Sequence, residues 1–153
     1  MTKKKRLLII GPSFRRNKND ELLLAIERYD GLFYRVARKY LGEAKNVDVL
    51  VMKDDLKLTE SKTLLAYAEP EGSQWGQKSF PIKILEEAKG RNEAFLEKKL
   101  QRGKYSQVFL SMGKKYAKAL PAMSKYDITV VFPATGGLGP KAQALKAWLC
   151  GEE

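Results

Sequence analysis

Four short apolar runs, rich in residues that favour strands, set the strongest limit on how this chain can fold. They cover residues 7–10, 47–52, 107–112 and 128–132. Each run is nearly continuous in its apolar character instead of alternating with polar residues, which is typical of strands buried on both faces of a parallel sheet. We therefore expect helices to cover both faces of such a sheet.

Helical patterns of apolar residues separate these runs, as an alternating strand-and-helix fold requires. The apolar stripes are Leu32, Val36, Tyr40 and Leu41; Ile84, Leu85, Ala88, Phe95, Leu96 and Leu100; Tyr116, Ala119 and Leu120; and Ala142, Leu145, Trp148 and Leu149. Gly90 lies within the second stripe, and the sequence leaves open whether it interrupts the helix. Residues 53–77 are expected to form a long loop with room for one added turn or strand.

These patterns predict a single α/β domain over residues 1–153, with a basic tail at residues 1–5. The expected architecture is three-layer and Rossmann-like, with a mostly parallel sheet of four to five strands flanked by helices and joined by right-handed crossovers. A chain of 153 residues with 44% apolar content can bury a core of this kind.

The charge of the chain is strongly unbalanced. There are 29 Lys and Arg residues against 18 Asp and Glu residues, which gives a formal net charge of +11. An excess of this size favours contact with a polyanion such as DNA or RNA. The alternative is a basic surface that serves only solubility.

The residue types that are missing exclude several kinds of chemistry. The chain has no histidine and a single cysteine, Cys150, so Ser-His-Asp and Cys-His catalysis, His-ligated metals and an intrachain disulfide are excluded. No cofactor and no metal site is predicted, and acid–base chemistry would fall to Asp, Glu, Lys, Tyr or water. No apolar run approaches the roughly 20 residues that span a bilayer, so we expect a cytoplasmic protein with no membrane partner.

A glycine-rich turn follows the last apolar run. Gly136, Gly137 and Gly139 stand between that run and the last helical pattern. Glycines allow a ligand to approach the backbone closely, and the free N–H groups at a helix start favour negative charge. The turn matches neither a Walker A loop nor a GxGxxG fingerprint, so a simple tight connection is the alternative interpretation.

Basic residues follow two other runs, at positions where the carboxyl ends of parallel strands would meet. Ser13, Arg15 and Arg16 follow the first run, and Lys114 begins the helical pattern after the third. Ligands of open parallel sheets bind beyond the carboxyl ends of the strands. The predicted binding site for phosphate or nucleic acid therefore consists of Ser13, Arg15, Arg16, Lys114, Gly136, Gly137 and Gly139. A solvated loop and an exposed helix start are the alternatives.

Two further features have both a functional and a structural interpretation. Asp54 and Asp55 follow the second run and could bind a metal or act as an acid or base, or they could lie in a solvated turn. Trp75 could stack on a base or anchor its loop in the core.

Several stretches together resemble a family of uncharacterised α/β domains that neighbours the YaaA-type peroxide-stress proteins. They are ERYDG (residues 27–31), then FYRVARKYL, VFLSMGKKYAKAL and finally GGLG with a downstream AWL. The resemblance covers most of the chain. The resemblance implies a role connected with nucleic-acid metabolism and a link to 7-deazaguanine-type base modification.

The chain departs from the family pattern where chemistry is expected. Pro12 stands where family members carry a cysteine, and Met52 and Leu56 stand at the Ser and Gly places of a second motif. A third element is represented only by Tyr67 and Glu69. If the first two motifs carry catalysis, this chain has lost it and keeps a binding role.

The leading prediction is a nucleic-acid-associated domain that binds phosphate, a nucleotide, DNA or RNA at the carboxyl edge of its sheet. The first alternative is an enzyme for a nucleobase, nucleotide or nucleic acid, with Asp54, Asp55 or Glu69 as general base, Tyr29 or Lys114 as electrostatic helper, and Mg²⁺ as a possible aid. The second is a structural or protein-interaction domain. The sequence leaves the oligomeric state open, as it does the choice between DNA, RNA and free nucleotide.

Overall fold

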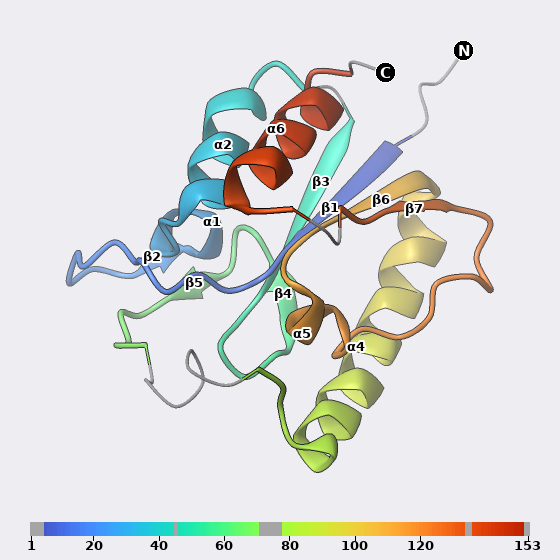
Figure 1. Ribbon diagram of the computed structural model, residues 1–153, viewed down its shortest axis with the longest axis horizontal. Helices are drawn as coiled ribbons and strands as arrows, with labels where there is room; N and C mark the ends of the chain where they lie inside the picture. The colour runs from blue at the N-terminus through green and yellow to red at the C-terminus, as the bar shows by residue number, and fades with distance from the viewer. Residues whose placement is uncertain (1–4, 45, 71–77, 134–135, 152–153) are drawn as a thin grey trace.

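The computed structural model describes residues 5–44, 46–70, 78–133 and 136–151 as a mixed α/β fold (Figure 1). In chain order, the elements are β1 (Lys5–Ile10), β2 (Leu23–Leu24), α1 (Ala25–Arg28), α2 (Leu32–Tyr40), β3 (Val47–Met52), β4 (Leu58–Glu60), β5 (Leu64–Leu65), α4 (Ile82–Gly103), β6 (Tyr105–Ser111), α5 (Lys114–Ala117), β7 (Thr129–Val131) and α6 (Leu138–Leu149).

The sheet has five strands in the order β4-β3-β1-β6-β7. Strand β1 pairs in parallel with β3 and β6, and β6 pairs in parallel with β7. Strand β4 pairs antiparallel with β3. The prediction of a mostly parallel sheet of four to five strands, flanked by helices, is therefore confirmed.

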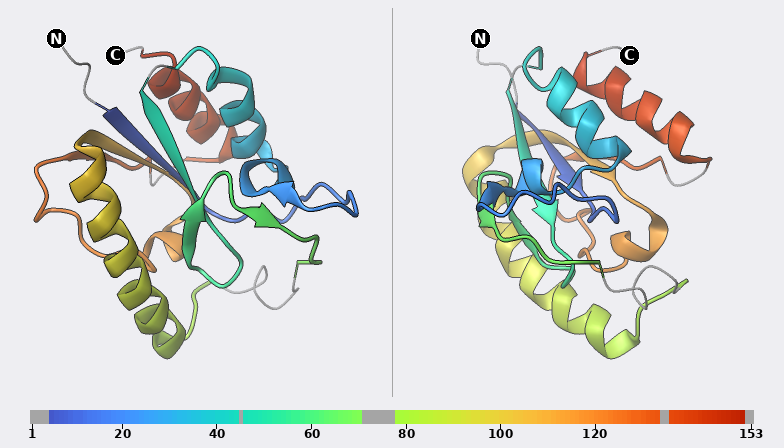
Figure 2. Two further views of the ribbon diagram at one scale, coloured as in Figure 1. Left: turned by 180° about the vertical axis from the view of Figure 1, so that it is seen from behind. Right: turned by 90° about the vertical axis from the view of Figure 1, so that its left-hand side faces the viewer.

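Alternation along the strands explains why the apolar runs are continuous. Leu7 and Ile9 point to the face covered by α4, while Leu8 and Ile10 point to the face covered by α2 and α6. The three helices lie on opposite sides of the sheet, as Figures 1 and 2 show. Both faces of the central strand are therefore buried, and neither can carry polar residues without cost.

The last apolar run behaves differently from the other three. Strand β7 covers only Thr129–Val131 and lies at the edge of the sheet. Thr129 and Val130 are exposed there, so the expectation that this run is buried on both faces is wrong. An edge strand has a neighbour on one side only, and the sequence run alone does not distinguish that position from a central one.

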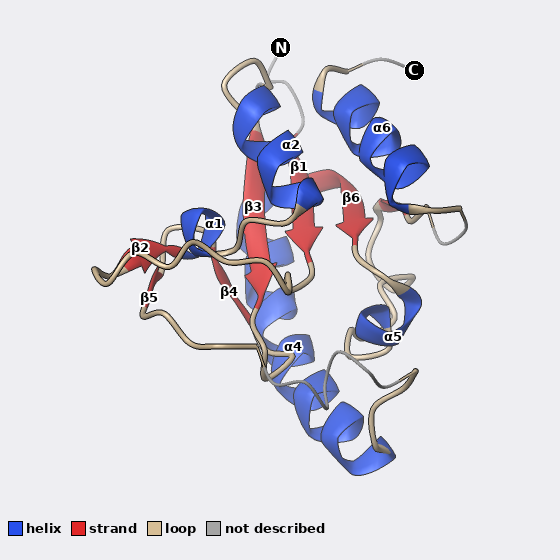
Figure 3. Cartoon of the chain, turned by 60° about the vertical axis from the view of Figure 1, so that its left-hand side comes forward, coloured by secondary structure: helices blue, strands red, loops and turns tan. Residues whose placement is uncertain are grey.

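Helix α4 is continuous through Gly90, which settles the question that the sequence left open. Gly90 is exposed, with open space beside it, and its backbone remains helical. The first turns of α4 extend past the sheet (Figures 1 and 3), which explains why Ile84 is exposed although it was assigned to the apolar stripe. The buried stripe of α4 begins at Ala88 instead.

A buried asparagine fixes α4 to the segment after β3. Asn92 is fully enclosed, and its side-chain oxygen accepts a hydrogen bond of 2.9 Å from the backbone N–H of Leu58. Its amide group donates to the carbonyl oxygens of Leu56 (2.8 Å) and Ala119 (2.9 Å). One side chain on α4 thus satisfies backbone groups from two separate segments.

Residues 53–70, expected to form most of a long loop, contain two short strands. A tight turn at residues 53–57 reverses the chain into β4, and Leu56 adopts a positive φ of 68° within it. Strand β5 then pairs antiparallel with β2 (Leu23–Leu24). In the described part of the chain, no helix combines the length and apolar character needed to cross a bilayer.

Candidate functional site

The carboxyl ends of β1, β3 and β6 lie along one edge of the sheet, which we call the carboxyl edge (Figure 3). Strand β7 is parallel to β6 and ends at the same edge. Strands β1 and β6 remain in close contact beyond their last residues. The N–H of Gly11 donates to the carbonyl oxygen of Ser111 at 3.0 Å, and a Cβ atom at position 11 would lie 2.8 Å from the Cβ of Met112. Only glycine fits here, and it begins the loop of residues 11–22, called the β1 loop.

Arg16 joins the β1 loop to the turn after β3. Its guanidinium donates two hydrogen bonds of 2.6 Å to the two carboxylate oxygens of Asp54, and a third of 2.8 Å to the carbonyl oxygen of Ala68. It also lies 5.2 Å from the ring centre of Tyr29. The side chain is 3% exposed. Within the described residues, Arg16 therefore serves as a bidentate clamp between two loops.

One nitrogen of this clamp remains unused. The Nε atom of Arg16 is buried and has no hydrogen-bond partner among the described residues. The clamp borders a hollow of about 250 Å³. The described residues that line this hollow are Arg16, Arg28, Tyr29, Lys53, Asp54, Asp55, Leu65, Ala66 and Ala68.

A second arginine, Arg28, holds the far part of the β1 loop and is not among the site residues predicted from the sequence. Its side chain is almost fully buried. Its guanidinium donates to the carbonyl oxygens of Asn17 and Asn19 at 2.8 Å each, to that of Leu65, and to that of Glu21. Because backbone carbonyls are present at every position, these acceptors leave no pattern in the sequence.

Two tyrosines pack beneath the β1 loop. The ring centres of Tyr29 and Tyr34 are 5.4 Å apart, and the hydroxyl of Tyr34 donates to the carbonyl oxygen of Gly11 at 2.7 Å. Burial raises the pKa of both hydroxyls, and the Asp54 carboxylate raises that of Tyr29 further. Both side chains therefore stay neutral at physiological pH.

Three arginines lie around the carboxylate of Asp30, just before α2. This carboxylate accepts hydrogen bonds from Arg35 (3.2 Å) and Arg38, and the Nε of Arg15 lies 3.5 Å away. Partial burial alone would raise the pKa of Asp30, but the hydrogen bonds from Arg35 and Arg38 outweigh it, so the pKa lies below its ordinary value. Arg15 remains largely exposed on this cluster.

Ser13 shapes the beginning of the β1 loop. Its hydroxyl donates to the carbonyl oxygen of Arg15 at 2.7 Å. A Cβ atom at Gly31 would lie 2.4 Å from the Ser13 Oγ, so the two segments pack closely. The Ser13 hydroxyl is thus engaged within its own loop.

The remaining predicted residues are exposed. Lys114 is the first residue of α5, which follows β6. Gly136 has a φ of 91°, Gly137 is the N-cap of α6, and Gly139 lies in its first turn. Helix α6 has no side-chain cap and no acidic residue in its first turn, and a Cβ atom at Gly137 or Gly139 would meet nothing within 4 Å.

The predicted residues thus follow successive strands along one edge but form two groups. Ser13, Arg15 and Arg16 belong to a network of internal contacts, whereas Lys114 and the three glycines are open to solvent. Trp75 lies outside the described residues. The part of the chain that the structure describes contains no group of three acidic or cysteine residues arranged to hold a metal ion.

The aspartates of the enzyme hypothesis both have structural partners. Asp54 holds Arg16, and an oxygen of Asp55 accepts the backbone N–H of Lys57 at 3.0 Å within the turn after β3. Lys53 lies 3.7 Å from Asp55. Glu69 and Lys114 are exposed, and Tyr29 is buried under Arg16.

Comparisons of this chain with known protein families, curated proteins and solved structures give no match. The functional interpretation therefore depends on the geometry and charge described above.

Proposed function

We propose that this chain is a Rossmann-like, three-layer domain whose carboxyl edge binds a phosphate group of a nucleotide or nucleic acid. The observation that carries the proposal is the start of α6. Three exposed glycines lie there, and no side chain caps the backbone N–H groups of Leu138 and Gly139, the first two residues of a twelve-residue helix. The third residue, Pro140, has no N–H. This helix start is at the edge where parallel sheets bind ligands.

Charge supports the same function. The net charge of +11 favours a polyanion, and the first turn of α6 contains Lys141 and no acidic residue. Lys114 stands exposed after the neighbouring strand β6. Arg15 and Lys18 are exposed cations of the β1 loop, whereas Arg16 contributes by holding that loop in place.

The resemblance to the family that neighbours the YaaA-type proteins remains a prediction. The ERYDG segment gives it a physical meaning, because Arg28, Tyr29, Asp30 and Gly31 all contact the β1 loop. A family that keeps this segment would keep the shape of that loop, whatever chemistry it has gained or lost.

A charge placed at the start of α6 tests the proposal. Gly137→Asp adds a carboxylate where a Cβ meets nothing, and Asp is a favourable N-cap, so the helix should be retained or stabilised. Anion binding should be lost, because the new carboxylate repels phosphate and occupies the free N–H groups. Fluorescence anisotropy of labelled single-stranded DNA and RNA across a salt series, with pyrophosphate as competitor, measures this.

Gly137→Asn is the matched control, since it supplies a neutral cap of nearly the same shape. Equal affinities for the Asp and Asn variants and the original chain would contradict the proposal. Arg15→Ala and Lys114→Ala should each lower the slope of log affinity against log salt by about one, provided that these cations contact phosphate.

A further inference from the structure

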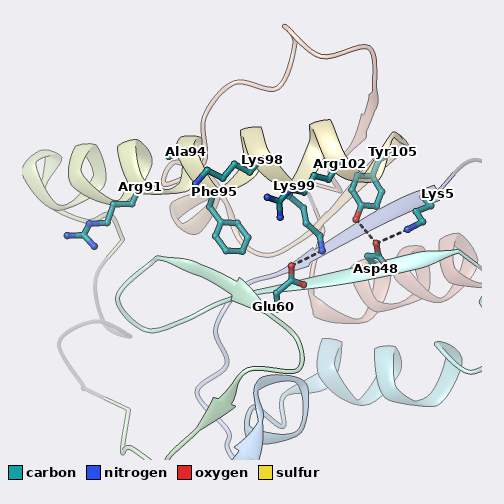
Figure 4. Close-up of a pocket in the computed structure, with 10 residues that line it drawn as sticks. All are labelled: Lys5, Asp48, Glu60, Arg91, Ala94, Phe95, Lys98, Lys99, Arg102 and Tyr105. Carbon is teal, nitrogen blue, oxygen red and sulfur yellow. Dashed lines mark hydrogen bonds and ion pairs between the residues drawn. The ribbon is translucent and has the colours of Figure 1, made fainter.

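A second and larger hollow lies at the opposite edge of the sheet, where β1, β3 and β6 begin. It has a volume of about 540 Å³ and lies between the second half of α4 and the sheet (Figure 4). We call it the α4 hollow. The described residues that line it are Lys5, Asp48, Glu60, Arg91, Ala94, Phe95, Lys98, Lys99, Arg102 and Tyr105. None of them was selected from the sequence as a site residue.

The alternation of the strands builds the floor of the α4 hollow. Lys5, Leu7 and Ile9 share the face of β1 that α4 covers, and Leu7 and Ile9 are fully buried there. Asp48 precedes Leu50 and Met52 on the same face of β3. The apolar core under α4 thus ends in charged residues at the amino ends of both strands.

The helical repeat of α4 builds the wall. Ala88, Asn92, Leu96 and Leu100 form its buried stripe. Arg91, Phe95, Lys98 and Arg102, spaced three or four residues apart, form the adjacent stripe that borders the hollow. Helical geometry therefore places three cations and one aromatic ring along a single side of the opening, as Figure 4 shows.

The carboxylates of the hollow are already neutralised by neighbours. Asp48 lies 3.8 Å from the Nζ of Lys5 and accepts a hydrogen bond from the hydroxyl of Tyr105. Glu60 accepts a hydrogen bond of 2.7 Å from Lys99. These contacts use two of the five cations of the hollow.

The other three cations, Arg91, Lys98 and Arg102, are exposed and have no ion-pair partner among the described residues. Three like charges held along one helix face repel one another, and a bound anion relieves that repulsion. The hollow therefore favours a ligand that carries negative charge.

An aromatic ring adds a second kind of recognition. Phe95 is partly buried, and its ring projects from α4 into the hollow between the cations (Figure 4). Flat rings beside a positive surface are the features with which proteins hold unpaired bases, since each base can stack on an aromatic face. A volume of about 540 Å³ falls within the range of roughly 300–1,000 Å³ for ligand pockets.

We propose that the α4 hollow binds a nucleotide unit, with its base against Phe95 and its phosphate between Lys98 and Arg102. The unit is either a free nucleotide or part of a single strand, which offer the same phosphate and base. The hollow lies at the opposite edge of the sheet from the start of α6, and its assignment is independent of the function proposed for the carboxyl edge.

Removal of the two central cations tests this site. Lys98→Ala with Arg102→Ala should weaken binding of a labelled single-stranded oligonucleotide and lower the slope of log affinity against log salt by roughly one per cation. The matched control is Lys83→Ala with Lys89→Ala, which removes the same charge from exposed positions of α4 outside the hollow. That control should leave the affinity and the slope nearly unchanged. Equal losses in the two double variants, or no loss in either, would overturn the proposal.

The aromatic contact has its own variant. Phe95→Leu keeps an apolar side chain for the core and removes the stacking face, so the affinity should fall roughly tenfold with the salt slope unchanged. Thermal unfolding followed by circular dichroism checks that the variant is folded. An unchanged affinity in a folded Phe95→Leu protein would remove the base from the proposal.

Competition with adenosine monophosphate, adenosine and inorganic phosphate separates the two sources of the ligand. Competition by the monophosphate alone supports a free nucleotide, and competition by none of them supports a strand, provided that the variants above lose affinity.

Gly137→Asp in the same assay separates the two sites. If only Lys98→Ala with Arg102→Ala lowers the affinity, the α4 hollow is supported as the binding site and binding at the carboxyl edge is rejected. If only Gly137→Asp lowers the affinity, the carboxyl edge is supported and the α4 hollow is rejected.

Discussion

The arginines that hold the β1 loop differ in burial from the cations of the α4 hollow that have no ion-pair partner among the described residues. Around the β1 loop, Arg16 and Arg28 are buried and Arg38 is partly exposed, and all three donate to carboxylates or backbone carbonyls. At the α4 hollow, Lys98 and Arg102 are exposed, with no such partner among the described residues. Burial and partners, more than residue type, thus separate cations that maintain the fold from cations that are available to a ligand.

The largest effect expected from this difference is at Arg28. Arg28→Ala removes the donor for four buried or partly buried carbonyl groups, and we expect a loss of about 3–4 kcal/mol in the free energy of unfolding. Urea denaturation measures this. Arg35→Ala is the control, since that exposed side chain makes one contact with Asp30 and should cost less than about 1 kcal/mol. Similar losses in both variants would show that burial does not separate the two groups.

The second effect concerns the Arg16 clamp. Asp54→Ala leaves a buried guanidinium without its counter-charge, and the expected loss is about 2–3 kcal/mol, because Asp54 itself is partly exposed. Arg16→Met combined with Asp54→Leu should recover most of that loss, since an apolar pair leaves no buried charge. A double variant as unstable as Asp54→Ala would show that Arg16 acts mainly through Ala68 and Tyr29.

A third test addresses the close packing at the carboxyl edge. Gly11→Ala would place a methyl group 2.8 Å from the Cβ of Met112, which moves only with its backbone, so a loss of about 1–3 kcal/mol is expected. Gly31→Ala meets the hydroxyl of Ser13, and the additional change Ser13→Ala should relieve part of its cost. Gly42→Ala, in open space, is the neutral control. Thermal unfolding temperatures rank the four proteins, and equal values for Gly11→Ala and Gly42→Ala would contradict the packing argument.

The contribution of Asp30 should depend on pH. Its pKa lies below the ordinary value in the folded protein, so its stabilising effect is complete above the unfolded pKa of about 3.9 and disappears as the pH falls through the folded pKa. Asp30→Asn should therefore cost about 1 kcal/mol at neutral pH, and the difference from the original chain should shrink below about pH 4. Urea denaturation at several pH values checks this, with Asp127→Asn as an exposed control. A difference that stays constant down to low pH would exclude the charge as its cause.

The smallest change in the free energy of unfolding is expected at the α4 hollow. Lys98→Ala with Arg102→Ala should change the free energy of unfolding by less than about 0.5 kcal/mol for each substitution, because neither side chain has an ion-pair partner within the described residues. A large loss of unfolding free energy in this variant would show that Lys98 and Arg102 stabilise the fold. It would also remove the difference between these cations and the arginines that hold the β1 loop.

The sequence was informative about the sheet because burial leaves a pattern. Runs 7–10, 47–52 and 107–112 coincide closely with β1, β3 and β6, whose buried faces exclude polar residues. Strand β4 has no such run, since three residues held by a tight turn suffice to pair it with β3. Gly90 stays helical because tertiary contacts of Ala88 and Leu96 outweigh its intrinsic propensity.

The candidate sites were less accessible to sequence reasoning. Parallel strands imply that the basic loops after them share one edge of the sheet. No local pattern in the sequence links Arg16 to Asp54, which lies 38 residues away. Arg28 bonds to backbone carbonyls, which every residue carries. The α4 hollow draws its charges from β1, β3, β4 and α4, so it exists only after those elements have packed.

Asn92 has a consequence for how the molecule opens. Its side-chain oxygen accepts the N–H of Leu58, and its amide group donates to the carbonyl oxygens of Leu56 and Ala119. The turn after β3 cannot separate from the helix without breaking these bonds inside the core. The amide hydrogen of Leu58 should therefore exchange with deuterated water only when α4 leaves the sheet, and its exchange rate would report that cooperative opening.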